Sequence, residues 1–177
     1  MITIALPLLV LALVLVAVLL VAVVARTRFP RVTVREYERG LKYVRGRFAG
    51  VVEPGAFRID AATTQVRKVD MRLAHIVLPG QEVLSADGVT LRLSLGGTWR
   101  MTDPATAVNE VQDYLQALYL TVQLAVRRVI GAAPIDDTLE RRAELGGRVL
   151  QLAAPEVAGL GLELVSLDLR DSCSPAT

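Results

Sequence analysis

Residues 89–95, Val89-Thr90-Leu91-Arg92-Leu93-Ser94-Leu95, have the clearest two-residue alternation in the chain. Successive side chains of a β-strand point to opposite faces, so the apolar residues at the odd positions would share one face. The stretch therefore predicts a sheet that is buried on one side. Gly96 and Gly97 interrupt the pattern, and residues 98–101 continue the strand with Trp99 available to the core.

The chain after residue 101 changes to the spacing of helices. Asp103 followed by Pro104 is typical of a helix start, since aspartate caps a helix and proline fits its first position. Glycines and alternating apolar residues then mark the end of the helical region. The predicted elements are helices over 104–111, over 114–130 and from Asp136 or Asp137 through Leu150, followed by a strand over 162–170.

The chain before residue 89 alternates less regularly and contains turn-forming residues near Arg39-Gly40 and Glu53-Pro54-Gly55. The predicted strands here cover residues 32–36, 41–45, 56–60, 65–72 and 73–78. Strands thus come first, then helices, then one strand. This order indicates an α+β domain in which helices pack on a mostly antiparallel sheet.

The N-terminal stretch from Ile2 to Ala25 is uncharged and rich in Leu, Val, Ile and Ala. A helix of about 24 residues would reach roughly 36 Å, enough to cross a hydrocarbon core of about 30 Å. A signal peptide would begin with a basic segment and have a shorter apolar core, and a buried helix would usually be shorter and amphipathic. We therefore predict a single transmembrane helix over residues 1–25.

Basic residues concentrate directly after this stretch. Residues 26–47 hold eight Arg or Lys against two Glu, whereas the rest of the chain holds twelve basic and sixteen acidic residues. By the positive-inside rule this predicts a single-pass protein of the cell membrane with its soluble domain in the cytoplasm. A nucleic-acid role is disfavoured, because the remaining domain is acidic and poor in aromatic residues. The predicted contacts with the lipid bilayer are Arg26, Arg28, Arg31, Arg45 and Arg47.

These arginines could instead only set the topology and solvate the first strands, so both interpretations remain open.

Catalytic chemistry finds little support in the sequence. His75 is the only histidine and Cys173 the only cysteine, so we predict no catalytic residues, no metal site and no cofactor. His75 is interpreted as an ordinary strand residue, and Asp136-Asp137 as a helix cap.

Several segments resemble the SPFH domain family, which includes stomatin, prohibitin and flotillin. The likeness runs in order over residues 34–170 and is strongest to bacterial stomatin-like (slipin) proteins. The segments are Val34-Arg35-Glu36-Tyr37-Glu38-Arg39-Gly40, Gly46-Arg47, Glu53-Pro54-Gly55, Val69-Asp70-Met71-Arg72, Gln81-Glu82-Val83-Leu84-Ser85-Ala86-Asp87-Gly88-Val89-Thr90 and Thr102-Asp103-Pro104 with Ala107-Val108 and Tyr114.

The resemblance implies a non-enzymatic membrane scaffold that forms homo-oligomers, organises a membrane microdomain and modulates membrane proteins such as proteases. It divides the chain into a transmembrane helix over 1–25, an SPFH domain over 26–171 and a short tail over 172–177 without the coiled coil usual in the family. Two alternatives remain, a monomeric membrane-tethered module that binds a single partner and a membrane-tethered hydrolase.

Overall fold

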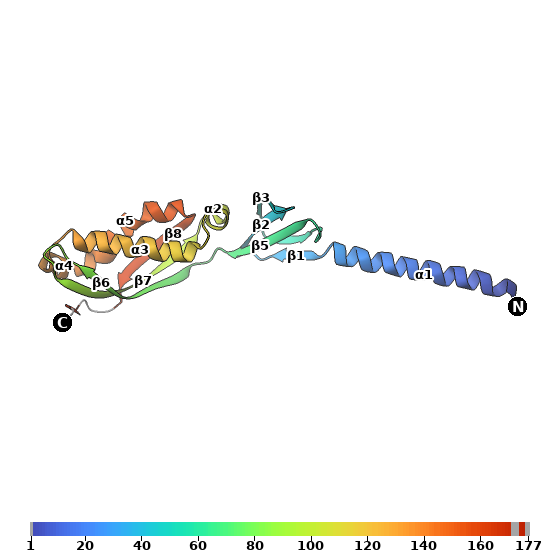
Figure 1. Cartoon of the computed structure of the whole chain (residues 1–177), viewed down its shortest axis with the longest axis horizontal. Helices are drawn as coiled ribbons and strands as arrows, with labels where there is room; N and C mark the ends of the chain where they lie inside the picture. The colour runs from blue at the N-terminus through green and yellow to red at the C-terminus, as the bar shows by residue number, and fades with distance from the viewer. Residues whose placement is uncertain (1, 171–173, 176–177) are drawn as a thin grey trace. The chain divides into compact units, whose positions relative to one another are not determined.

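The computed structural model describes residues 2–170 and 174–175, and it describes the side chains of all of these except 2–10, 12, 24, 25, 27, 174 and 175. The chain divides into two compact units, Met1–Val69 (unit 1) and Asp70–Thr177 (unit 2). Figure 1 shows the elements of both units, and each unit is described by itself.

Unit 1 contains one helix and five short strands. Strands β1 and β4 pair antiparallel as a two-stranded sheet, and β3, β2 and β5 form a second sheet in that order. Within the described residues the buried apolar side chains of this unit are Val34, Leu41 and Val69. The elements are α1 (Ile2–Arg28), β1 (Arg31–Val34), β2 (Glu38–Val44), β3 (Arg47–Val52), β4 (Gly55–Arg58) and β5 (Thr64–Asp70).

The predicted transmembrane helix over residues 1–25 is not supported, although α1 is helical over this range. Among the side chains that the structure describes, no helix is both long and apolar enough to cross a membrane. The predicted single-pass topology and cytoplasmic placement depended on this helix, so they are not supported either.

The strand predictions for unit 1 are correct in kind but shifted in place. The turn predicted near Arg39-Gly40 is wrong, because both residues lie inside β2 and the chain turns at Glu36 and Tyr37 instead. Strand β3 was not predicted. It follows β2 after a two-residue turn and pairs with it from Val44↔Arg47 to Gly40↔Val52.

Unit 2 consists of an antiparallel sheet and a set of helices. The sheet has the order β6-β7-β8, and the short β9 pairs with β7. The elements are β6 (Ala74–Leu84), β7 (Thr90–Met101), α2 (Pro104–Asn109), α3 (Tyr114–Gly131), α4 (Ile135–Glu140), η1 (Arg142–Glu144), α5 (Leu145–Gly159), β8 (Leu162–Leu169) and β9 (Ser174–Pro175).

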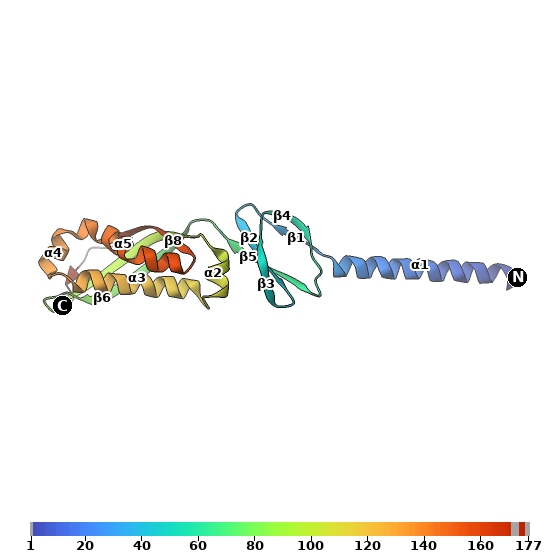
Figure 2. The ribbon, with the colours of Figure 1, turned by 90° about the horizontal axis from the view of Figure 1, so that it is seen from above.

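The predicted alternation over 89–95 is confirmed in β7. Leu91, Leu93 and Leu95 are buried, while Arg92 is exposed. Helices α3 and α5 cover the buried face of the sheet and lie next to each other in both views (Figures 1 and 2). The other face of the sheet carries no helix. The α+β class and the antiparallel pairing follow from this arrangement.

Strands continue through two places in unit 2 where the sequence pattern is interrupted. The strand end predicted at Leu78 is wrong, whereas the continuation of the strand past Gly96-Gly97 was predicted. Strand β6 continues through Pro79-Gly80, where its register against β7 shifts between Leu78 and Gln81. Strand β7 continues through Gly96-Gly97. A Cβ on Gly97 would lie 2.4 Å from the Ser166 carbonyl oxygen, so glycine is required where β8 approaches.

The helix starts follow the expected capping chemistry with one exception. The Asp103 carboxylate accepts the backbone N–H groups of Ala105 and Thr106, as predicted. The cap predicted at Asp136 or Asp137 is wrong, because α4 begins after Pro134, whose side chain makes no cap. Helix α5 runs through Pro155 and ends at Gly159, in agreement with the expectation that glycines mark the end of the helical region.

The missing cap of α4 comes from a distant turn. The Asp87 carboxylate, between β6 and β7, accepts the Ile135 N–H at 3.3 Å and the Ser85 hydroxyl. The Ser85 O–H is the largest cause that lowers the pKa of Asp87 from its ordinary value. The tail predicted over 172–177 lies mostly outside the described residues, apart from the two residues of β9.

Candidate functional site

The first group of predicted site residues surrounds the end of α1. Arg26 and Arg28 occupy its last turn, and Arg31 is the first residue of β1. All three side chains are exposed. Arg28 is partly neutralised, since its Nε lies 3.7 Å from Asp60 Oδ1. The α1 terminus thus presents exposed cations next to the start of the first sheet.

The second group lies on the β2–β3 hairpin. Arg45 and Gly46 have φ angles of 51° and 79°, the backbone of a two-residue turn with both central residues left-handed. This turn places Arg45 and Arg47 at an exposed tip. The ring of Phe48, which is 43% exposed, lies 5.8 Å from that of Tyr43. The tip therefore combines two cations with an exposed aromatic ring.

One turn, Asp60–Thr63, connects the two groups. The Ala61 N–H donates to the Arg28 carbonyl at 3.0 Å, and the Arg45 N–H donates to the Thr63 carbonyl at 2.7 Å. The Asp60 carboxylate accepts from Ala62 N–H and from the Thr63 hydroxyl, which holds the turn in shape. The structure therefore brings Arg28 and Arg45 to the same turn, although they are far apart in the sequence.

Arg58 belongs to this basic surface and was not among the predicted site residues. Its Cα is the direct partner of Arg31 across β1 and β4, so the two side chains share a face. Within the described residues neither makes an ion pair or a hydrogen bond. Like charges directly opposite each other destabilise a strand pair unless an anion lies between them. Repulsion across this pair is a physical reason to expect an anionic partner here.

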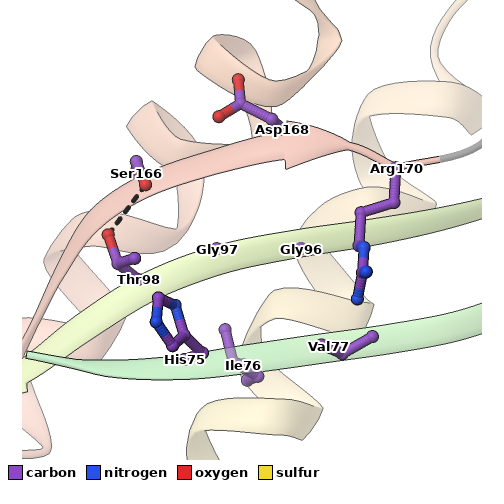
Figure 3. Close-up of a pocket in the computed structure, with 9 residues that line it drawn as sticks. All are labelled: His75, Ile76, Val77, Gly96, Gly97, Thr98, Ser166, Asp168 and Arg170. Carbon is purple, nitrogen blue, oxygen red and sulfur yellow. Dashed lines mark hydrogen bonds between the residues drawn. The ribbon is translucent and has the colours of Figure 1, made fainter.

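A separate hollow of about 510 Å³ lies on the open face of the unit 2 sheet (Figure 3). It forms over Gly96 and Gly97, which have no side chains to fill it. The Arg170 side chain lies over this strand, and a Cβ on Gly96 would be 2.7 Å from its Cδ. His75 reaches the hollow from β6 and Asp168 from β8. Since these polar side chains line one hollow, they are the candidates in unit 2 for a catalytic arrangement.

The hollow contains Ser166, His75 and Asp168, but their geometry is not that of a catalytic triad. The Ser166 hydroxyl pairs with the Thr98 hydroxyl at 2.8 Å, and Asp168 points away from His75 in Figure 3. Among the described residues no hydrogen bond joins His75 to either of the other two. A triad needs the base within hydrogen-bond reach of its nucleophile and its orienting acid. His75 is exposed, as an ordinary outward-facing strand residue would be.

A metal site receives no support from the described side chains, which contain no group of three or more His, Cys, Asp or Glu placed to hold an ion. Cys173 lies outside the described residues. The features that remain are a cationic unit with few buried residues and an α+β unit with a helix-covered antiparallel sheet. An exposed basic surface beside a helix-covered sheet is typical of a binding or scaffold protein.

The chain belongs to the SPFH domain / Band 7 family, whose sequence pattern matches residues 32–177. It is 34% identical over 138 residues to a protein of Archaeoglobus fulgidus, covering 78% of this chain and 55% of that relative. It is 30% identical over 143 residues to a stomatin homologue of Pyrococcus horikoshii, covering 81% of this chain and 54% of that relative. Caenorhabditis elegans stomatin-1 is 26% identical over 144 residues, covering 81% of this chain and 44% of that relative.

The SPFH family predicted from sequence is therefore confirmed, while the narrower likeness to bacterial slipins stays a prediction. Members of the family are generally membrane-associated, oligomeric scaffolds without enzymatic activity, and membership supports a scaffold-type role for this chain. The chain spans about half the length of these two archaeal relatives.

Proposed function

We propose that this protein is a scaffold that self-associates at an anionic membrane surface and there organises lipids and membrane proteins. The observation that carries the proposal is the basic surface of unit 1, where one turn connects the α1 terminus to the β2–β3 tip. Anionic headgroups attract exposed Arg and Lys side chains at about 1 kcal/mol each. Membrane association as a family property is in keeping with this surface.

The exposed apolar side chains of α1 agree with the same proposal. Residues 13–23 of the helix expose more than half of the accessible surface of every Leu and Val among them. A large exposed apolar surface marks a site of contact with a membrane or another protein. Apolar contact and charge attraction would then act on the same unit.

The proposal is tested by binding of the full chain to vesicles. Replacing Arg45 and Arg47 by Gln is expected to weaken binding to phosphatidylserine-containing vesicles by about five-fold per arginine, which is the factor that about 1 kcal/mol provides. Binding to pure phosphatidylcholine vesicles should stay nearly unchanged. The control replaces Arg67 and Lys68, two exposed cations of β5, by Gln. Equal losses in both double variants would overturn the assignment of this surface.

Self-association is supported by the unequal charges of the two units. Residues 1–69 carry eleven basic and four acidic side chains, and residues 70–177 carry nine basic and fourteen acidic ones. Unlike charges favour contact between unit 1 of one copy and unit 2 of the next, which builds rings or filaments. Mass measurement of the full chain in detergent should show oligomers that dissociate in about 1 M salt, where the Debye length is about 3 Å. A monomer at every salt concentration would favour a module for a single partner instead.

The partners of such a scaffold would be membrane proteins, and proteases are one class that the family resemblance suggests. A membrane protease reconstituted with this protein is expected to cleave its substrate at a changed rate. The R45Q/R47Q variant, with its weakened lipid contact, should change that rate less. An unaltered rate with several unrelated proteases would remove this part of the proposal and leave the lipid contact standing.

A further inference from the structure

Unit 1 contains a hollow of about 290 Å³ between its two small sheets, here called the unit 1 hollow. Its volume is close to the lower end of small-molecule sites, which run from about 300 to 1,000 Å³. Strands β1 to β5 and the residue after β4 all contribute to its lining. The apolar lining residues are Val32, Val34, Val52, Phe57, Ile59 and Val66.

Three of the lining valines pack around Gly40 in β2. A Cβ on Gly40 would lie 3.0 Å from Val66 Cγ1 and 3.1 Å from Val34 Cγ2, so three valines of the lining converge on a position without a side chain. The third is Val52, the direct partner of Gly40 across β2 and β3. Leu41, the next residue in β2, points to the opposite face and is fully buried there. These valines thus form an apolar wall of the hollow, on the face of β2 opposite to Leu41.

Two cations complete the lining, Lys42 from β2 and Arg58 from β4. Lys42 lies two residues from Gly40, on the same face of the strand. Neither the Lys42 ammonium nor the Arg58 guanidinium makes a hydrogen bond or an ion pair within the part of the chain that the structure describes. Cations beside an apolar surface gain most from a carboxylate, because charge-assisted hydrogen bonds are about twice as strong as neutral ones.

From this combination we propose that the unit 1 hollow binds a medium-chain fatty acid. The acyl chain lies against the valines, and the carboxylate pairs with Lys42 and Arg58. A volume of 290 Å³ holds about ten water-sized groups at roughly 30 Å³ each, which suits one chain of about ten carbons and excludes a diacyl lipid. The inference goes beyond the proposed function and does not depend on it, since the membrane test uses Arg45 and Arg47, which do not line the hollow.

The test uses a photoactivatable fatty acid of about ten carbons with a diazirine in its chain, added to the full protein in phosphatidylcholine vesicles. After irradiation, cross-linked peptides are located by mass spectrometry. Cross-links are expected in the segments that contain Val32, Val52 and Phe57. The K42Q/R58Q variant should lose at least ten-fold of this labelling, as should a probe in which the carboxylate is replaced by an alcohol. The matched control is R67Q/K68Q, which removes the same charge from exposed positions outside the hollow.

A second variant tests the apolar part. Replacing Val66 by Phe adds a ring that fills the hollow, and it should abolish labelling at Val32 and Val52 while the variant keeps the circular dichroism of the parent. Labelling confined to α1 would overturn the proposal, because it would report partition into lipid alone. Equal labelling of K42Q/R58Q and R67Q/K68Q would overturn it as well.

Discussion

The two units of this chain differ both in charge and in packing. Unit 1 is the more basic unit, and unit 2 has the larger buried core. Unit 1 is strongly basic and buries three apolar residues among those described, with an unfilled hollow between its sheets. Unit 2 is acidic and buries twenty-one, many of them without any exposed surface. A surface that binds lipid headgroups gains from charge and deformability, whereas a platform for assembly gains from a rigid core. The comparison therefore agrees with the proposed lipid contact of unit 1 and gives unit 2 the larger buried core.

The difference in packing between the units is tested most strongly by removing core atoms from each of them. Leu118 on α3 is fully buried, so Leu118→Ala should lower the free energy of unfolding of unit 2 by about 2 to 5 kcal/mol. Val66→Ala removes atoms that already border a hollow and should cost unit 1 about 1 kcal/mol or less. Hydrogen exchange of the full chain, followed by mass spectrometry, reads both units at once.

The fluorescence of Trp99, the only tryptophan, provides an independent readout of unit 2 during urea unfolding. The L118A variant should move this transition to lower urea, and V66A should leave it in place. If V66A costs as much as L118A, the unit 1 hollow is packed in solution and the contrast between the units disappears.

Two glycines with left-handed backbone, one in each unit, test the same difference in packing. Gly161 in unit 2 has φ 75°, and a Cβ there would lie 2.4 Å from the Asp103 carbonyl oxygen. Gly46 in unit 1 has φ 79°, and a Cβ added there would have no neighbouring atom within 4 Å. Gly46→Ala therefore costs only the backbone strain of about 1 to 2 kcal/mol, whereas Gly161→Ala adds an overpacking cost of about 1 to 3 kcal/mol.

Hydrogen exchange again separates the two effects, because each variant should change protection only in its own unit. Gly46→Asn should lose less stability than Gly46→Ala, because asparagine tolerates a left-handed backbone better than alanine. Asparagine should recover little at Gly161, where the space is missing. Equal losses at the two glycines would show that unit 2 is no more tightly packed than unit 1.

The sequence predicted the parts of this molecule that depend on local patterns. The Leu91, Leu93 and Leu95 alternation indicated the buried face of the sheet, and Asp103-Pro104 indicated the start of α2. Segment order and spacing were enough to identify the SPFH family, which the match over residues 32–177 confirms. In the strand and the helix cap the sequence signal, the two-residue alternation or the Asp-Pro pair, lies within a few residues, and the predictions succeed for that reason.

The parts that could not be predicted depend on contacts between distant segments. The cap of α4 comes from Asp87, 48 residues away, so the local candidates Asp136 and Asp137 were misleading. The Asp60–Thr63 turn, which joins Arg28 to Arg45, depends on hydrogen bonds that no local pattern indicates. The predicted transmembrane span of α1 is also not supported, because among the described side chains no helix is both long and apolar enough to cross a membrane.

The smallest predicted effect tests whether the acidic side chains of unit 2 also support its fold. Asp103→Ala removes the cap of α2 and should lower the free energy of unfolding of unit 2 by about 1 kcal/mol at neutral pH. Asp103→Asn keeps an oxygen that accepts the Ala105 and Thr106 N–H groups, so it should lose only a fraction of that. Urea unfolding followed by Trp99 fluorescence measures both variants.

The pH dependence of stability separates the contribution of the Asp103 charge from that of its hydrogen-bond geometry. The Thr106 hydroxyl, together with the Thr106 and Ala105 N–H groups, holds the pKa of Asp103 below its ordinary value. A carboxyl whose pKa is lower in the folded state stabilises the fold above its unfolded pKa of about 3.9, and this contribution disappears as the pH falls through the folded pKa. The stability difference between the parent and D103N should therefore be constant from neutral pH to about pH 5 and should shrink below about pH 4. A difference that does not change with pH would mean that the Asp103 cap acts by hydrogen-bond geometry alone and that its charge adds nothing to the stability of unit 2.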